Sequence, residues 1–113
     1  METIEALIHR RSCRNYSDRP VETEKLARII EAGQYAPSGM GRQSVKLLAV
    51  QDPAAIAALE RLNGGVLGSP EAHPFYGAPT VCVVFADTSV GTWVEDGSLV
   101  IGNMLAAAHS LGV

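Results

Sequence analysis

The segment from Thr92 to Leu111 constrains the fold of this chain more than any other. Leu, Val, Ile, Met and Ala dominate it, and its C-terminal half is apolar almost all round. A helix of this kind has no polar face to turn to water, so it is predicted to be a central, buried helix. Gly112 follows where a helix C-cap glycine belongs. The 113-residue chain then stops at Val113.

Two short apolar runs are predicted to be strands. Val45–Val50 is the first, and Thr80–Ala86, which is rich in β-branched residues, is the second. Their continuous apolar character is typical of strands that are covered on both faces. Two such strands do not make a stable sheet by themselves. The sequence therefore looks like the front part of a larger domain.

Three further helices are expected from apolar spacing. Thr3–His9 and Glu22–Tyr35 carry apolar residues three and four apart. Pro53–Leu62 follows Asp52, which can cap the free N–H groups, and Pro53 suits a first turn. The run Asn63-Gly64-Gly65 is predicted to stop this helix.

Composition excludes several classes of protein. Nine Lys and Arg against twelve Asp and Glu give a net charge of −3, which argues against a nucleic-acid binder. The acidic N-terminus does not resemble a signal peptide, and no apolar stretch is long enough to span a bilayer. Cys13 and Cys82 are far apart and are interpreted as free thiols. We therefore expect a cytoplasmic protein with no membrane partner.

The first candidate site is the basic run Arg10–Tyr16. If the chain is extended here, Arg10, Ser12 and Arg14 share a face. Two guanidinium groups around a hydroxyl form a good phosphate clamp, because arginine offers planar bidentate donors to an oxyanion. The equally weighted alternative is a solvated basic surface with partners inside the chain, such as Asp18.

The second candidate is the loop Ala36–Gln43, which has two glycines and several polar donors. Such a loop lets the backbone approach a flat ligand closely. It follows a helix rather than a strand, so it is not a Rossmann fingerprint, and standing alone it is more often a turn.

Other polar residues give no catalytic or metal site. The three histidines lie too far apart in sequence to predict metal ligands, and no motif of a catalytic nucleophile is present. Glu95 and Asp96 stand at the start of the last helix, where their predicted role is to stabilise the helix dipole.

Taken together, four blocks in chain order resemble the nitroreductase family of FMN-dependent oxidoreductases. The blocks are Arg10–Tyr16, similar to the family's RRSxRxF/Y; Ala32–Ser38 with Gln43, similar to EAxxxAPSxxNxQP; Phe75–Pro79; and Glu95–Gly97 with Asn103–Ala107. Each block is weak alone, but the ordered set is fairly specific and spans nearly the whole chain.

The resemblance implies an α+β fold: a mixed sheet flanked by helices around a central apolar helix, with residues 1–113 as a single domain that lacks its C-terminal part. It also implies a homodimer with FMN at the subunit interface. One subunit would hold the phosphate, the ribityl chain and the pyrimidine edge with Arg10, Arg11, Ser12 and Arg14. The other subunit would line the isoalloxazine ring with Pro37, Ser38, Gly39, Met40 and Gln43.

The activity implied by the resemblance is a ping-pong hydride transfer. NAD(P)H, as co-substrate, would reduce the flavin, and a small-molecule acceptor such as a nitroaromatic or a quinone would then be reduced. Arg14 is expected near the N1–O2 edge of the ring, where its charge stabilises the reduced flavin anion. No side chain is expected to act as a catalytic nucleophile.

Three departures from the family pattern motivate alternatives. Gly41 stands where the family usually has Asn, Ser44-Val45 replaces the usual Pro-Trp, and the chain ends at Val113 where relatives continue. One alternative is a non-catalytic dimer or scaffold of the same fold. Another is a different flavin reaction, such as dehalogenation or flavin destruction.

Overall fold

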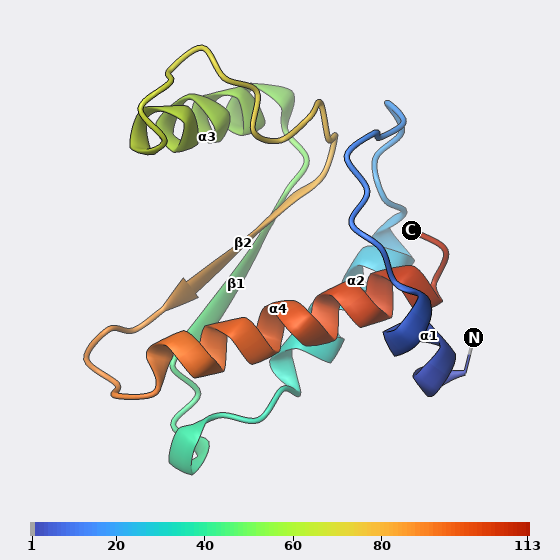
Figure 1. Ribbon diagram of the computed structural model, residues 1–113, viewed down its shortest axis with the longest axis vertical. Coiled ribbons are helices and arrows are strands. Elements are labelled where there is room, and N and C mark those ends of the chain that lie inside the picture. The colour runs from blue at the N-terminus through green and yellow to red at the C-terminus, as the bar shows by residue number, and fades with distance from the viewer. Residues whose placement is uncertain (1) are drawn as a thin grey trace. The chain divides into compact units, whose positions relative to one another are not determined.

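The computed structural model describes residues 2–113 and has an α+β architecture (Figure 1). In chain order its elements are α1 (Thr3–His9), α2 (Thr23–Gln34), the 3-10 turn η1 (Gly39–Gly41), β1 (Val45–Val50), α3 (Pro53–Val66), β2 (Val81–Ala86) and α4 (Trp93–Ser110). The predicted fold class and the predicted bounds of α1 and β1 are confirmed. β2 and α4 each begin one residue later than the sequence predicts, a difference within normal end fraying.

Two predicted helix ends are confirmed by their hydrogen bonds. At the start of α3, Asp52 Oδ2 accepts a bond of 2.9 Å from the N–H of Ala55, and Pro53 occupies the first turn. At the end of α4, Gly112 adopts a left-handed φ of 77° and the N–H of Val113 donates to the carbonyl of Ala108 at 3.0 Å. This return bond is the Schellman pattern that a C-cap glycine permits.

The predicted stop of α3 at Asn63-Gly64-Gly65 is wrong, because the helix continues to Val66. Gly64 is buried, and a Cβ added to it would lie 2.7 Å from the carbonyl oxygen of Ser69. The N–H of Ser69 also donates to the carbonyl of Gly64 at 2.8 Å. Gly64 therefore serves the close return of the chain after the helix rather than ending the helix.

The described chain divides into two compact units. The first contains the residues up to Arg11, then Glu22–Leu48 and Val83–Val113; the second contains Ser12–Val21 and Ala49–Cys82. β1 and β2 form a two-stranded sheet, and both strands have residues in each unit. The strands run antiparallel, and beside them the N–H of Asp87 donates to the carbonyl of Ser44 at 2.8 Å (Figure 1).

The core of the first unit lies where α1 and α2 pack against α4 (Figure 1). Ala6, Ile29, Val100 and Met104 are its buried apolar side chains. A Cβ on Gly33 would lie 2.9 Å from Met104 Cγ, so the glycine permits the close approach of α2 and α4.

The expectation that α4 is buried all round is wrong for the described chain. Leu99, Ile101 and Leu105 are 47%, 44% and 48% exposed. α1 and α2 cover only the face that carries Val100 and Met104. The strands also depart from the prediction of two covered faces, since Leu48 and Phe85 are about half exposed.

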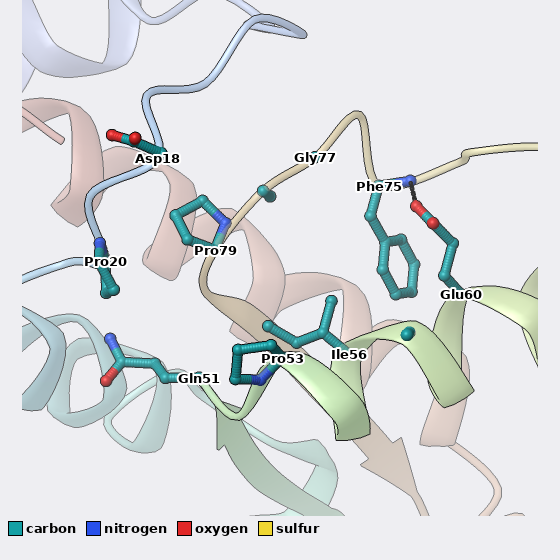
Figure 2. A pocket seen from close by; sticks show the side chains of 11 residues that line it. Asp18, Pro20, Gln51, Pro53, Ile56, Glu60, Phe75, Gly77 and Pro79 are labelled. Carbon is teal, nitrogen blue, oxygen red and sulfur yellow. Dashed lines mark hydrogen bonds between the residues drawn. The ribbon is translucent and has the colours of Figure 1, made fainter.

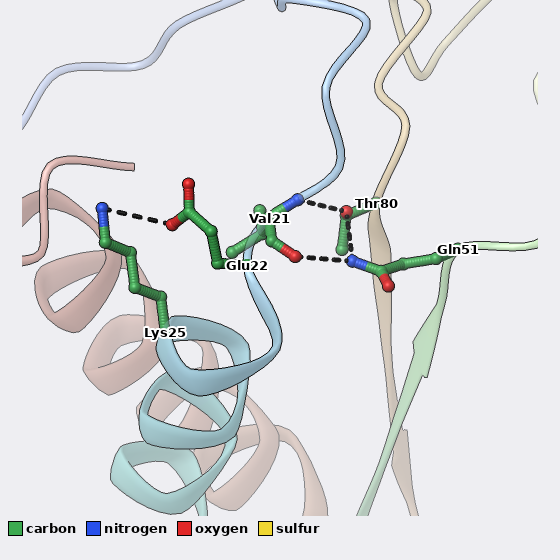
Figure 3. A network of polar contacts seen from close by, with 5 residues as sticks. All are labelled: Val21, Glu22, Lys25, Gln51 and Thr80. Atoms are coloured by element: carbon green, nitrogen blue, oxygen red, sulfur yellow. Dashed lines mark hydrogen bonds and ion pairs between the residues drawn. The ribbon is translucent and has the colours of Figure 1, made fainter.

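In the second unit a side-chain amide joins two backbone segments, as Figure 3 shows. Gln51 Nε2 donates to the carbonyl of Val21 at 2.9 Å and to Thr80 Oγ1 at 3.0 Å. Thr80 Oγ1 also accepts a bond of 3.1 Å from the N–H of Val21. This triangle fixes the end of the segment 12–21 against the residues that lead into β2.

Candidate functional site

The loop between α2 and β1 carries the five residues predicted to line a flat ligand: Pro37, Ser38, Gly39, Met40 and Gln43. The structure brings these five residues together in the first unit. The loop is closed by short bonds: Ser38 Oγ accepts from the N–H of Gln43 at 3.1 Å, and the carbonyl of Ser38 accepts from the N–H of Gly41 at 3.0 Å. It is therefore a compact turn.

The backbone of this loop is unusual because Met40, Gly41 and Gln43 all adopt left-handed φ values, 53°, 65° and 51°. Non-glycine residues adopt this conformation rarely. Glycine and asparagine tolerate it best, which explains how Gly41 can stand where the family usually has Asn. Met40 is 89% exposed, so the centre of the loop is open to an incoming ligand.

Asp96, on the first turn of α4, anchors this loop. Its Oδ1 accepts a bond of 2.9 Å from the N–H of Gly39. Its Oδ2 accepts from Ser44 Oγ at 2.7 Å and from Thr92 Oγ1 at 3.0 Å. The side chain is only 2% exposed, so the start of the loop, its end and the start of α4 meet on one buried carboxylate.

These donors favour the ionised form of Asp96. The N–H of Gly39, followed by the Ser44 hydroxyl, holds the pKa of this carboxyl below its ordinary value, although desolvation opposes the shift. The role predicted from sequence, stabilisation of the helix dipole, misses this contact. The sequence could indicate only the contact between Thr92 and Asp96, which are four residues apart. Gly39 and Ser44 lie far from Asp96 along the chain.

Gly39 is also required by packing. A Cβ at this position would lie 2.3 Å from Thr92 Oγ1, 2.7 Å from Thr92 Cγ2 and 2.9 Å from Thr92 Cβ. Thr92 Cβ cannot move away by side-chain rotation. The loop therefore lies directly on the residue that precedes α4.

The four predicted phosphate-binding residues follow α1. Arg10 and Arg11 belong to the first unit, and Ser12 and Arg14 belong to the second. The complete clamp would need residues of both units, so it stays a prediction. Arg11 also has a contact that the sequence did not indicate: its Nη1 donates to the carbonyls of Ile8 and Arg10, both at 2.9 Å, and so caps the end of α1.

A separate pocket of about 340 Å³ lies in the second unit, and Figure 2 shows its lining. Its walls include Pro20, Pro53, Ile56, Phe75 and Pro79, and none of the nine predicted cofactor residues lines it. It is therefore distinct from the loop that Asp96 anchors.

Glu60 stands at the edge of this pocket and is already engaged. Its Oε2 accepts a bond of 3.0 Å from the N–H of Phe75 (Figure 2). Its Oε1 lies 3.2 Å from His73 Nδ1. The His73 side chain, followed by the N–H of Phe75, lowers the pKa of Glu60. This carboxylate therefore holds the loop that follows α3.

Residues 2–113 contain neither a metal-binding cluster nor a membrane-spanning helix. No three His, Cys, Asp or Glu side chains within this range are grouped so that they could hold a metal ion. No helix within it is both long and apolar enough to cross a membrane.

Comparison with known proteins gives consistent matches. The model of the nitroreductase family matches residues 7–78. An FMN reductase (NAD(P)H) of Bacillus subtilis strain 168 is 44% identical over 131 aligned residues, which cover 99% of this chain and 51% of that protein.

Solved structures match as well. A nitroreductase with bound FMN from Bacteroides fragilis superposes with a TM-score of 0.89 at 29% identity, over 99% of this chain and 66% of that one. A nitroreductase with bound FMN from Desulfitobacterium hafniense gives a TM-score of 0.86 at 30% identity, over 97% and 65%. The chain thus spans between half and two thirds of the length of these relatives.

Proposed function

Because this chain belongs to the nitroreductase family, we propose that it acts, as one domain over residues 1–113, as an FMN-dependent oxidoreductase that takes its electrons from NAD(P)H. One observation carries the proposal. The family match over residues 7–78 contains all nine residues predicted to hold FMN. Similar chains from Bacteroides fragilis and Desulfitobacterium hafniense were solved with FMN bound.

The donor chemistry of the chain fits a flavin phosphate. Within the described residues, the guanidinium groups of Arg10 and Arg14 have no hydrogen bond or ion pair. Arg14 is exposed and Arg10 partly so. Arginines without internal partners can offer bidentate bonds to a dianionic phosphate. We therefore assign Arg10, Arg11, Ser12 and Arg14 to the phosphate, the ribityl chain and the pyrimidine edge of FMN, with Arg14 at the ring.

The loop between α2 and β1 fits the flat ring. Gly41 leaves the backbone uncovered at the centre of the loop, since no atom lies within 4 Å of an added Cβ there, and Met40 is exposed. Its polar atoms are backbone groups and the side chains of Ser38, Arg42 and Gln43, which suit a largely apolar aromatic face with a polar edge. We assign Pro37, Ser38, Gly39, Met40 and Gln43 to this face, in a homodimer whose two subunits share each FMN.

Bound FMN supplies the redox chemistry of the proposed reaction, because it can accept a hydride from NAD(P)H and pass it to a nitroaromatic, a quinone or a similar acceptor. The side chains of the protein bind FMN and orient it. Arg14 places a positive charge beside the ring, and the loop leaves one face open for donor and acceptor to occupy in turn. The free thiols Cys13 and Cys82 suit the proposed cytoplasmic location.

The test is a flavin spectrum of the purified chain after incubation with FMN. We expect a yellow protein whose visible absorbance bleaches when NADPH is added and returns when a quinone is added. Arg14→Ala should weaken FMN binding about tenfold or more, since a charged hydrogen bond to the N1–O2 edge of the flavin is lost.

Arg28→Ala is the matched control, because Arg28 is an exposed arginine on α2 outside the proposed site. It removes the same charge and should leave FMN binding unchanged. A protein that takes up no FMN contradicts the proposal. Binding without turnover over a panel of donors and acceptors would instead favour a non-catalytic protein of the same fold.

A further inference from the structure

The carboxylate of Asp96 ties both ends of one loop to the start of α4. The N–H of Gly39 and the hydroxyl of Ser44 bond to its two oxygens at 2.9 and 2.7 Å. The residues between these ends include Met40 and Gln43, two non-glycine residues whose left-handed φ values require support from their surroundings. The loop is therefore held at its ends, while its centre faces outward.

The ionised form of Asp96 suits this task better than a neutral side chain. An ionised carboxylate only accepts hydrogen bonds, and all three groups around it are donors. A buried charge is stable only when such bonds compensate it, so loss of the charge or of a donor loosens the whole arrangement. In an amide, the NH₂ group that replaces one carboxylate oxygen could not accept the hydrogen bonds that this oxygen receives.

We propose that Asp96 is a positioning residue for FMN, holding the loop Gly39–Ser44 in the shape that receives the isoalloxazine ring before the cofactor binds. The inference rests on the proposed function for the identity of the ligand. A loop that is already ordered loses little conformational entropy on binding, so its anchor raises affinity without touching the ligand. Ser44 shares this role, because its hydroxyl makes the shortest of the three bonds to the carboxylate.

The experiment compares Asp96→Asn and Ser44→Ala with the wild-type chain. The dissociation constant for FMN is measured by flavin fluorescence, and amide hydrogen exchange is measured without FMN. We expect both variants to raise the dissociation constant, Asp96→Asn about tenfold, because the binding-competent loop becomes a minor population. The amides of Gly39 and Gln43 should lose protection, while those of Val100 and Met104 in the core of α4 keep it.

Glu95→Gln is the control, since it removes a charge from the same helical turn at an exposed side chain. It should change neither readout. If Asp96→Asn does not fold, Ser44→Ala carries the test alone. Unchanged affinity and unchanged loop exchange in the folded variants would overturn the inference while leaving the proposed function intact. A wild-type chain that binds no FMN would overturn both, and the first titration reveals this.

Discussion

Two carboxylates hold two loops in this chain, one in each unit. Asp96 anchors the loop between α2 and β1, and Glu60 anchors the loop between α3 and β2. Both loops place a non-glycine residue and then a glycine in the left-handed region, Met40-Gly41 in the first and Tyr76-Gly77 in the second. The two loops share this backbone conformation, but the carboxylates that anchor them differ in their surroundings.

The difference lies in burial and in the donors. Asp96 is 2% exposed and accepts bonds from a backbone N–H and two hydroxyls. Glu60 has a side chain that is 19% exposed, and its partner His73 is 83% exposed. The contacts of Glu60 are therefore more accessible to water than those of Asp96. The buried Asp96 fixes its loop as part of the core, whereas the partly exposed Glu60 holds its loop less firmly.

The largest effect is expected for Asp96→Asn. It should lower the urea midpoint of unfolding more than substitutions at Gly39, Ser44 or His73 do, because the amide replaces an accepting oxygen by an NH₂ group and removes the buried charge that the three donors stabilise. Equilibrium urea unfolding at neutral pH measures this change in the midpoint.

The pH dependence of the stability of Asp96→Asn, compared with that of the wild type, tests whether Asp96 is ionised. The pKa of Asp96 is lower in the folded protein than its ordinary value of 3.8. Its contribution to stability is therefore present above that value and is lost as the pH falls through the lower folded pKa. The difference in stability between the wild type and Asp96→Asn should shrink in acid. A difference that grows in acid would contradict an ionised Asp96.

Gly39→Ala should come next, at about 2 kcal/mol of lost unfolding free energy, because its Cβ would overlap Thr92. Gly65→Ala is its control in the other unit. Gly65 lies inside α3 with no atom within 4 Å of an added Cβ, so alanine should stabilise the chain by about 0.5–1 kcal/mol. Equal effects of the two substitutions would show that the loop does not lie on Thr92.

Ser44→Ala removes one of the three bonds to Asp96. We expect a loss of about 1 kcal/mol in unfolding free energy, the usual value for one hydrogen bond. Combining it with Asp96→Asn in a double-mutant cycle should show coupling between the two positions. Additive effects would separate Ser44 from the anchor.

The smallest effect is expected for His73→Ala. Because His73 is exposed and Phe75 still donates to Glu60, unfolding free energy should hardly change. A loss comparable to that of Ser44→Ala would remove the contrast between the two anchors.

Local patterns were sufficient to predict most of the fold. Asp52-Pro53 and Gly112 set helix ends through nearest-neighbour chemistry, and both were predicted correctly. The stop at Gly64 was wrong because that glycine serves a tertiary contact with Ser69, which no local rule contains. The exposure of Leu99 and Leu105 could not be predicted either, since apolar residues alone do not say which neighbour covers them.

The candidate site divides in the same way. The loop residues from Pro37 to Gln43 are adjacent in sequence, so a motif predicted their grouping. Asp96 is separated from Gly39 and Ser44 by β1, α3 and β2, and only the folded chain joins them. The predicted clamp of Arg10, Ser12 and Arg14 remains a prediction.

The most direct measurement follows backbone amide chemical shifts during a titration with FMN. The proposed function predicts saturable shifts at Gly39, Met40 and Gln43, in the loop that Asp96 anchors. The chemical shifts of the Phe75 and Gly77 amides, in the loop that Glu60 anchors, should not change. Shifts confined to Phe75 and Gly77, or no saturable shift at all, would contradict the assignment of the flavin to the first loop.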